Sequence, residues 1–595
     1  MALTRSLCGA RLPAMRTLLA ALLILSPAAW AADPAPVSAS RGMVVTAQRL
    51  ASDVGAQVLR DGGNAVDAAV AVGYALAVTY PAAGNLGGGG FMTVRLADGR
   101  TAFLDFREKA PLAATAGMFL DAKGDVVPRL SLDSWLAVGV PGSAAGLELA
   151  RVRYGTLPRA ALMAPAIRLA REGFPVTAGD MAVIGTATAA LARDPAASAI
   201  FLRDGKAMRP GDRLVQADLA ATLQALSDQG PDALYRGPIG ASIAAASAAG
   251  GGLMTTRDLD AYRVREMRPI ECDYRGFHII SAPPPSSGGV ILCEMLGILG
   301  GYDLRAMGFH SAAEVHVLVE AMRLAYYDRN NRLGDPDFVE NPIAQLLDPA
   351  YHASLRARIE PERATLSSTL VAAAPAKEGT NTTHYSVVDA AGNAVAVTYT
   401  LNEWFGTGKV APGTGIVMNN EMDDFTSKPG VPNLFGLVQG AANAIAPGKT
   451  PLSSMTPTII TRDGQVAMVI GSPGGARIIT IVMEAVINAV DHGMTVQEAI
   501  NAPRIHHQWL PDTVYVERFA LSPDTRALLE ARGYKFTDGR PWGVAEGVIA
   551  GGPSLARAAE GSGAGSMSLG AAPAGGALFG AHDARGGAGA ASGAD

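Results

Sequence analysis

The chain has 595 residues, of which 49% are hydrophobic and 17% are charged, so its composition is that of a globular protein rather than a disordered one. Its formal net charge of −5 provides no basic surface of the kind that binds nucleic acid, and no nucleic-acid partner is expected. The length allows either one large layered core or several domains.

The N-terminal residues have the pattern of a secretory signal. An apolar run from Leu18 to Leu25 follows the basic residues Arg5, Arg11 and Arg16. Ala29-Trp30-Ala31 then places small residues where a signal peptidase reads them, which predicts a signal peptide over residues 1–31 and a periplasmic location in a Gram-negative cell. An uncleaved anchor is the alternative. No later apolar stretch reaches about 18 residues, so no membrane span is expected after the signal is removed.

Removal of the signal peptide would also remove Cys8 and leave two cysteines, Cys272 and Cys293. An oxidising compartment allows these two to form a bridge. A chain with so large a core does not need one, and we therefore predict no structural disulfide.

Two helices are predicted near the start of the mature chain. The first runs from Ser52 to Leu59 and stops at a Gly-Gly pair. Asn64 is the expected N-cap of the second, which runs from Ala65 to about Thr79 and is ended by Pro81. Because this second helix is apolar on all sides, we expect it to lie inside a layered core.

Strand-like and helical segments then alternate in blocks. Ala- and Leu-rich helical stretches occupy the region from Ser143 to about Arg329. Strands are predicted before and after it, at Phe91–Leu96, Thr101–Phe106, Thr383–Asp389, Ala394–Thr400, Thr458–Thr461 and Val466–Ile470. Blocks of strands between blocks of helices predict sheet layers that are covered by helices.

A pair of threonines, Thr382 and Thr383, follows Asn381 at the start of one of these strands. A threonine hydroxyl is a weak nucleophile, but a free α-amine on the same residue can activate it, which requires the chain to be cut immediately before that residue. The pattern therefore suggests a processing event between Asn381 and Thr382 as well as a nucleophile at Thr382. The alternative is that both threonines are ordinary β-branched strand residues.

Two consecutive glycines, Gly474 and Gly475, precede a helical pattern that starts near Ala476. Attack on an amide carbonyl develops negative charge on oxygen, and bare backbone N–H groups at the positive end of a helix stabilise such a charge. We interpret the two glycines as an oxyanion hole, with a simple turn as the alternative.

Other candidate residues have weaker patterns. His384 lies two residues after Thr382, where its ring would point beside the nucleophile, and we interpret it as structural. The pair His506-His507 lacks the spacing of further metal ligands. The glycines from Gly87 to Gly90 lack the Lys-Ser/Thr ending of a P-loop and are interpreted as a tight turn near the active site. No metal or cofactor is expected.

A series of short strings lies between roughly Ala47 and Pro541, in the order Gly84–Phe91, Asp105–Glu108, Pro283–Gly289, Thr382–Asp389, Asn419–Phe425, Pro451–Met455 and Gly471–Gly475. Together they resemble the γ-glutamyltranspeptidase family. Each string is weak by itself, but their number and order make the resemblance specific. They cover most of the mature chain.

The resemblance implies an α/β (α+β) fold, namely the four-layer αββα sandwich of the N-terminal nucleophile hydrolases. It also implies that Thr382 Oγ attacks the carbonyl of Asn381, so that the precursor cuts itself into a large subunit, 32–381, and a small subunit, 382–595. The new α-amine of Thr382 then acts as base toward its own hydroxyl. Thr400 is implied to hydrogen-bond the nucleophile and assist processing, and no cofactor is implied.

The implied substrate is glutathione or another γ-glutamyl donor, and the implied acceptor is water, an amino acid or a peptide. A γ-glutamyl group ends in a free amino acid, so its pocket must hold one carboxylate and one ammonium. Arg107 matches the family's carboxylate-binding arginine, although between acidic neighbours it would otherwise be interpreted as a solvated charge. Ser453 and Ser454 supplement it, and the ammonium site is matched by Asn402, Glu421 and Asp424.

Two stretches depart from the family pattern. Residues 429–436 resemble the lid over the pocket, but Phe435 stands where many bacterial members carry a tyrosine that bonds the residue matching Asn402. Loss of that bond costs about 0.5–1.5 kcal/mol, which predicts a lid that opens more readily. Residues 543–565 look like an insertion, and a Gly- and Ala-rich tail from about residue 554 is predicted to be largely mobile.

Two other functions are alternatives to a γ-glutamyl-transferring enzyme. A related acylase removes glutaryl groups from β-lactam precursors, but such a substrate lacks the α-ammonium that Asn402, Glu421 and Asp424 would bind. A periplasmic solute-binding protein is also exported and layered, but would remain one uncut chain.

Overall fold

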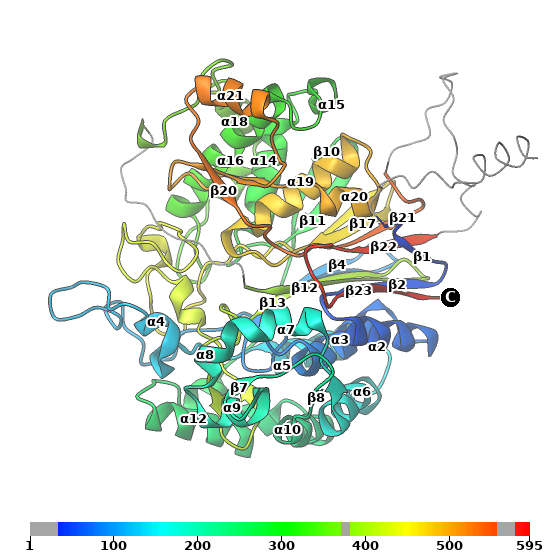
Figure 1. Ribbon diagram of the computed structural model, residues 1–595, viewed down its shortest axis with the longest axis vertical. Helices are drawn as coiled ribbons and strands as arrows, with labels where there is room; N and C mark the ends of the chain where they lie inside the picture. The colour runs from blue at the N-terminus through cyan, green and yellow to red at the C-terminus, as the bar shows by residue number, and fades with distance from the viewer. Residues whose placement is uncertain (1–33, 370–380, 556–576) are drawn as a thin grey trace, which may run out of the picture. The chain divides into compact units, whose positions relative to one another are not determined.

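Two seven-stranded sheets form the centre of the protein (Figure 1). The structure is a computed structural model and describes residues 34–369, 381–555 and 577–595. The nucleophile sheet, named for the strand that Thr382 precedes, has the order β23 (Ala590–Ala594), β2 (Gly42–Thr46), β12 (Thr383–Asp389), β13 (Ala394–Thr400), β3 (Gly89–Arg95), β4 (Thr101–Asp105) and β9 (Arg265–Met267). The second sheet has the order β1 (Val37–Ala39), β22 (Leu578–His582), β21 (Glu546–Ala550), β17 (Gln465–Gly471), β16 (Thr458–Arg462), β11 (Phe277–Ser281) and β10 (Ile270–Tyr274). All neighbouring strands in both are antiparallel.

The two sheets pack face to face through small and branched apolar residues. Met43 and Val45 of the nucleophile sheet share a buried cluster with Val469 and Val548 of the second sheet. Successive residues of β12 point to opposite faces, so Val388 joins this cluster while Val387 joins the core on the other side of its sheet. Both faces of β12 are therefore buried.

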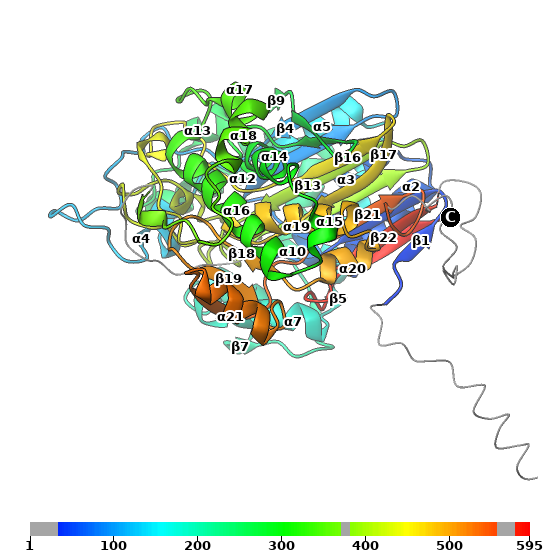
Figure 2. The same ribbon diagram turned by 90° about the horizontal axis from the view of Figure 1, so that it is seen from above.

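Helices cover the outer face of each sheet, as Figures 1 and 2 show. The nucleophile sheet packs against α2 (Arg49–Arg60), α3 (Ala65–Thr79) and α5 (Ser143–Tyr154), while α6 (Arg159–Glu172) packs on α3 and α10 (Ala217–Gln229) on α6. The second sheet packs against α14 (Gly288–Leu299), α19 (Ile478–Val490) and α20 (Val496–Asn501), while α16 (Ala312–Arg332) packs on α14. This arrangement confirms the predicted four-layer αββα sandwich.

The predicted apolar helix has the expected limits and place. Helix α3 spans Ala65–Thr79, every residue in it is buried, and the Asn64 side chain accepts hydrogen bonds from the amides of Val66 and Asp67. It lies between the nucleophile sheet and helices α5 and α6, which explains why no polar face is needed.

The remaining elements decorate this core. The shorter helices are α4 (Leu130–Asp133), α7 (Ala178–Ile184), α8 (Thr188–Leu191), α9 (Pro195–Phe201), α11 (Asp232–Tyr235), α12 (Pro238–Ala249), α13 (Thr256–Ala261), α15 (Leu304–Met307), α17 (Ile343–Leu346), α18 (Pro349–Arg356) and α21 (Pro523–Ala531). The small sheets pair β5 (Phe174–Pro175) with β8 (Arg213–Leu214), β6 (Leu202–Arg203) with β7 (Lys206–Ala207), and β14 (Val410–Ala411) with β15 (Ile416–Val417), and join β18 (Ile505–His506), β19 (Val514–Glu517) and β20 (Phe536–Gly539).

In the described ranges no helix is long and apolar enough to span a membrane. The predicted signal peptide, 1–31, lies outside them.

The C-terminal tail is not mobile where it is described, so this part of the prediction was wrong. Strand β22 lies inside the second sheet and β23 at the edge of the nucleophile sheet. Small residues there permit close packing: a Cβ on Gly580 would lie 2.5 Å from Met43 Sδ. Residues 556–576 of the tail lie outside the described ranges. Within the predicted insertion, Glu546–Ala550 form the core strand β21.

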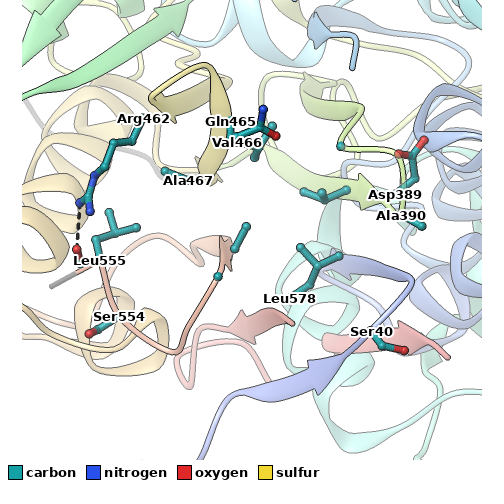
Figure 3. Close-up of a pocket in the computed structure, with 14 residues that line it drawn as sticks. Ser40, Asp389, Ala390, Arg462, Gln465, Val466, Ala467, Ser554, Leu555 and Leu578 are labelled. Carbon is teal, nitrogen blue, oxygen red and sulfur yellow. Dashed lines mark hydrogen bonds between the residues drawn. The ribbon is translucent and has the colours of Figure 1, made fainter. Parts of the chain in front are cut away.

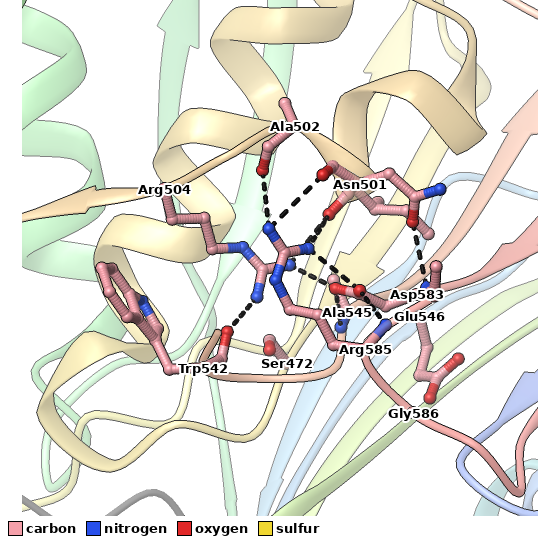
Figure 4. A network of polar contacts seen from close by, with 12 residues as sticks. Ser472, Asn501, Ala502, Arg504, Trp542, Ala545, Glu546, Asp583, Arg585 and Gly586 are labelled. Carbon is pink, nitrogen blue, oxygen red and sulfur yellow. Dashed lines mark hydrogen bonds and ion pairs between the residues drawn. The ribbon is translucent and has the colours of Figure 1, made fainter. Parts of the chain in front are cut away.

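A buried ion network ties this tail to the body (Figure 4). The carboxylate of Asp583, just after β22, forms ion pairs with Arg504 and Arg585. Arg585 also donates to the carbonyl of Ala502, and Arg504 donates to that of Trp542. The charges hold the end of the chain against α20, a contact that composition alone does not reveal.

The prediction of no structural disulfide was also wrong. Cys272 on β10 is bonded to Cys293 on α14, with 6.0 Å between their Cα atoms. Helix α14 packs directly on β10, which brings the two cysteines within bridging distance despite the size of the core. The bridge fixes an outer helix to an edge strand.

Replacing both Cys272 and Cys293 by serine reopens a loop whose ends are 21 residues apart. Closing such a loop contributes roughly 3 kcal/mol, so we expect the double variant to unfold at a lower guanidinium concentration than the wild type, as followed by tryptophan fluorescence. Recovery of the two cysteines on separate peptides after digestion of the wild type without reductant would contradict the bridge.

Candidate active site

Two threonine hydroxyls converge on one peptide carbonyl. In the uncut chain, Thr382 Oγ1 donates a hydrogen bond to the carbonyl oxygen of Asn381. Thr400, the last residue of β13, donates to the same oxygen at 3.2 Å, and its Oγ1 lies 3.3 Å from Thr382 Oγ1. The pairing of β12 with β13, in which Thr383 is opposite Tyr399, places both threonines at one end of the hairpin.

A pocket opens at this end of the hairpin. It is lined by Arg107, Arg329, Thr382, Thr400, Asn402, Glu421, Asp424, Phe435, Leu437, Ser453, Ser454, Met455, Gly475, Ala476 and Ile478. The structure therefore brings together, in one pocket, candidate site residues that lie up to hundreds of positions apart in the sequence. Asn381 and Gly474 are not among the lining residues but are adjacent in the chain to Thr382 and Gly475.

A larger cavity of about 600 Å³ lies elsewhere, beside the far end of β12 (Figure 3). Its walls include Ser40, Asp389, Arg462 and Gln465, and none of the nominated site residues. Size alone therefore does not locate the chemistry of this protein.

Arg107 anchors one wall of the pocket. It follows β4, is 1% exposed, and its Nη1 and Nη2 lie 2.8 Å and 2.5 Å from carboxylate oxygens of Glu421 and Asp424. Burial lowers the pKa of Arg107, but the two carboxylates outweigh this and raise its pKa above the ordinary value. The guanidinium is held charged and fixed in the pocket.

Several buried acceptors in the pocket have no donor. Among the described residues, Asn402 Oδ1 and both carboxylate oxygens of Glu421 form no hydrogen bond, because the close contact of Glu421 with Arg107 is not aligned as one. Burial raises the pKa of Glu421, and Arg107 opposes this rise. Buried acceptors without donors are costly, and a ligand with an ammonium group, which carries three donors, would satisfy them.

Asn402, whose side-chain oxygen is one of these acceptors, has an unusual backbone conformation. Its φ of +73° is in the left-handed region, which non-glycine residues seldom adopt. Its side-chain amide donates to the carbonyl of Asn420 at 3.0 Å, and its backbone amide donates to Thr400 Oγ1 at 2.9 Å. These contacts fix the side chain so that its oxygen remains available.

Two serine hydroxyls in the pocket are set up as donors. Ser453 Oγ accepts from the amide of Met455 at 3.1 Å, and Ser454 Oγ accepts from Arg329 at 2.8 Å. Because each oxygen already accepts, its hydrogen is free to point at an anion in the pocket. The serine loop, residues 453–455, is held by the Pro283–Gly289 turn, where Ser286 and Ser287 donate to the carbonyls of Met455 and Ser453.

The two glycines follow β17 with φ values of +148° at Gly474 and +55° at Gly475. These values favour glycine. Gly475 begins the 3₁₀ turn η6 (Gly475–Arg477), which continues into α19, and Gly474 caps it without a side-chain hydrogen bond. The helical segment thus starts within one residue of the predicted position, with its N-terminal amides beside the pocket.

The other singled-out residues lie away from the pocket wall. The buried His384 ring contacts Thr398 Oγ1 at 2.8 Å and Ser386 Oγ at 3.1 Å, and burial lowers its pKa to about 3. His507 contacts Asp512 at 3.4 Å, and the described part of the chain contains no cluster suited to a metal ion. Gly88 is where the carbonyl of Thr400 approaches, since a Cβ there would lie 2.1 Å from it.

The gamma-glutamyltranspeptidase family model matches residues 51–569. The chain belongs to this family. The glutathione hydrolase proenzyme of Pseudomonas sp. (strain A14) is 57% identical over 526 residues, which are 88% of this chain and 92% of that protein. The glutathione hydrolase proenzyme of Escherichia coli (strain K12) is 50% identical over 523 residues, 87% of this chain and 89% of that protein. The crystal structure of cephalosporin acylase from Bacillus halodurans matches with a TM-score of 0.80 at 27% identity, over 96% of this chain and 99% of that one.

The segment that resembles the family's lid, residues 429–436, is attached to the acidic turn η4 (Glu421–Asp424). The amide of Leu434 donates to Asp423 at 2.9 Å, and Asn433 donates to Asp424 at 3.3 Å. Phe435 is buried and lines the pocket. The acidic turn thus contacts the lid on one side and Arg107 on the other.

One charged residue of the pocket was not predicted from the sequence. Arg329, on α16, is fully buried and lines the pocket. Its position in a polar run near the end of a long helix is typical of a surface residue, and none of the family strings includes it. Only the packing of α16 against the serine loop places it here.

Proposed function

We propose that this chain is the precursor of a γ-glutamyltransferase and glutathione hydrolase. It takes the γ-glutamyl group from glutathione or a similar amide and passes it to water, an amino acid or a peptide. The observation that carries the proposal is the convergence of the Thr382 and Thr400 hydroxyls on the Asn381 carbonyl, at the mouth of a pocket with paired sites for a carboxylate and an ammonium. Export to the periplasm through a cleaved signal peptide, 1–31, is part of this proposal.

Processing begins with attack of Thr382 Oγ on the carbonyl carbon of Asn381. The Thr400 hydroxyl donates to the carbonyl oxygen and so draws electron density away from that carbon. The C–N bond breaks as the acyl group moves from nitrogen to oxygen, and water then opens the ester. The products are residues 32–381 and 382–595, the second of which begins with the free amine of Thr382.

In turnover, that amine accepts the proton of the Thr382 hydroxyl as Oγ attacks the γ-carbonyl of the donor. The amides of Gly474 and Gly475 stabilise the oxyanion, a type of contact whose loss costs about 10²–10³ in rate. The leaving amine takes the proton and departs, which leaves a γ-glutamyl ester on Thr382. Water or an acceptor amine then opens this ester, and no cofactor takes part.

The pocket charges match the free amino-acid end of a γ-glutamyl group. Arg107, Ser453 and Ser454 present donors to the α-carboxylate. The ammonium would bind at Asn402, Glu421 and Asp424, of which Asn402 and Glu421 have buried acceptors without donors among the described residues. Arg107 pairs with Glu421 and Asp424, so a zwitterionic substrate adds one charge of each sign and leaves the charge of the pocket unchanged.

A glutaryl acylase is the second candidate, because the structure resembles a cephalosporin acylase over nearly its whole length. A glutaryl group lacks the α-ammonium and would leave Asn402 Oδ1 and Glu421 without donors. Faster turnover of a glutaryl anilide than of a γ-glutamyl anilide would favour the acylase.

The function is tested by comparing the wild type with Thr382→Ala on a denaturing gel and with a γ-glutamyl anilide. We expect two fragments and turnover from the wild type, but one full-length chain and no turnover from Thr382→Ala. Thr382→Ser keeps a hydroxyl and should still be cut, though more slowly. Two fragments from Thr382→Ala would assign the cut to another protease and contradict self-processing.

A Phe435→Tyr variant tests the lid. The new hydroxyl can donate to Asn402 Oδ1, which has no donor among the described residues. A bond worth about 0.5–1.5 kcal/mol should hold the lid closed and lower the KM for the γ-glutamyl donor roughly twofold to tenfold. Phe435→Leu, which removes aromatic cover without adding a donor, is the control and should raise this KM. If Phe435→Tyr has the same donor and acceptor kinetics as the wild type, the prediction that Phe435 makes the lid open more readily is wrong.

A further inference from the structure

Arg329 is a buried cation whose hydrogen-bond partners among the described residues are all neutral. Its Nε donates to Ser287 Oγ at 2.9 Å, its Nη1 to Asn330 Oδ1 at 2.8 Å, and its Nη2 to Ser454 Oγ at 2.8 Å. No carboxylate of the described residues forms an ion pair with it, whereas Arg107, in the same pocket, has two. Among the described residues the Arg329 guanidinium therefore contacts only neutral groups directly, because the two carboxylates of the pocket are paired with Arg107.

Such a charge is expensive to bury. A guanidinium removed from water without a counter-ion loses several kcal/mol of solvation, and its neutral hydrogen-bond acceptors recover only part of this. Burial lowers the pKa of Arg329 to about 10, so it stays protonated at neutral pH, and the field of Asp424 favours this charge while Arg107 opposes it. An anionic group bound in the pocket would place a counter-ion close to Arg329.

The hydrogen bonds of Arg329 also set the direction of the serine loop. Ser454 Oγ accepts from Arg329, so its own hydrogen is left for a ligand. Ser287 Oγ accepts from Arg329 and donates to the carbonyl of Ser453 at 2.7 Å, which fixes the neighbouring serine through the backbone. One guanidinium thus holds both serines of the pocket.

We propose that Arg329 is a positioning residue for recognition of the donor's α-carboxylate, because it orients the Ser453–Ser454 hydroxyls as donors and places a second positive charge behind them. The inference rests on the proposed function. It assigns to Arg329 a role in binding one group of the substrate and none in attack on the γ-carbonyl. The effect of replacing Arg329 on KM should therefore depend on whether the donor carries a carboxylate.

A pair of anilides separates this role from general support of the pocket. γ-Glutamyl-p-nitroanilide carries both the ammonium and the α-carboxylate, while 4-aminobutyryl-p-nitroanilide keeps the amine and the acyl carbon but lacks the carboxylate. For Arg329→Gln we expect KM for the first to rise roughly tenfold to a hundredfold, with kcat little changed, as for loss of hydrogen bonds to a charged group. kcat/KM for the second should stay within about twofold.

Two further variants make the test specific. Arg332 lies on the same helix, is partly exposed and pairs with Asp328 away from the pocket. In Arg332→Gln, KM and kcat for both anilides should therefore equal those of the wild type. Ser454→Ala should weaken γ-glutamyl binding by itself, but should add less than its full effect in the Arg329→Gln background, because the two groups act as one unit. Fragment formation on a gel verifies that each variant has folded and been processed.

If Arg329→Gln is not processed, Arg329→Lys supplies the answer, since lysine keeps the charge but cannot span Ser287 and Ser454 together. Arg329→Lys should lower the preference for the γ-glutamyl over the 4-aminobutyryl anilide by a smaller factor than Arg329→Gln does. Equal losses on both anilides, or an unchanged preference in the Arg329 variants, would overturn the proposal. A wild type without γ-glutamyl turnover would instead contradict the proposed function, so the two failures are distinguishable.

Discussion

The proposed chemistry depends on a short contact at the end of one β-hairpin, where the hydroxyls of Thr382 and Thr400 meet the carbonyl of Asn381. Hydrogen bonding between β12 and β13 fixes this contact, and both strands are buried between a helical layer and the second sheet. A rigid core therefore positions the groups that react. In the proposed mechanism the same geometry serves twice, first against the chain's own peptide bond and then against a substrate amide.

The pocket beside this contact is organised by unmet hydrogen-bonding and charge requirements. Among the described residues, Asn402 and Glu421 have buried acceptors without donors, while the Ser453 and Ser454 hydroxyls accept hydrogen bonds but donate none. Acceptors gathered on one side and donors on the other suit a zwitterion. Arg329 extends this principle, since it is a buried cation that the described part of the protein does not pair with a carboxylate. A ligand with an ammonium and a carboxylate would satisfy these groups.

Local sequence patterns predicted local structure well. Asn64 and the apolar run after it were enough to give the limits of α3, and alternation gave those of β12 and β13. Features that depend on distant contacts were missed. The Cys272–Cys293 bridge requires α14 to pack on β10, and the final strand β23 pairs with β2, more than 500 positions earlier. Arg329 could not be placed in the pocket before the position of α16 was known.

We propose that Thr382 becomes an N-terminal residue and carries the γ-glutamyl group during turnover. Acid quenching of processed enzyme in the steady state with a γ-glutamyl donor, followed by peptide mass spectrometry, tests this proposal. We expect a γ-glutamyl ester on a peptide whose N-terminus is Thr382, and no such adduct with Thr382→Ala. An adduct on any other residue, or full activity in material that remains uncut before Thr382, would contradict it.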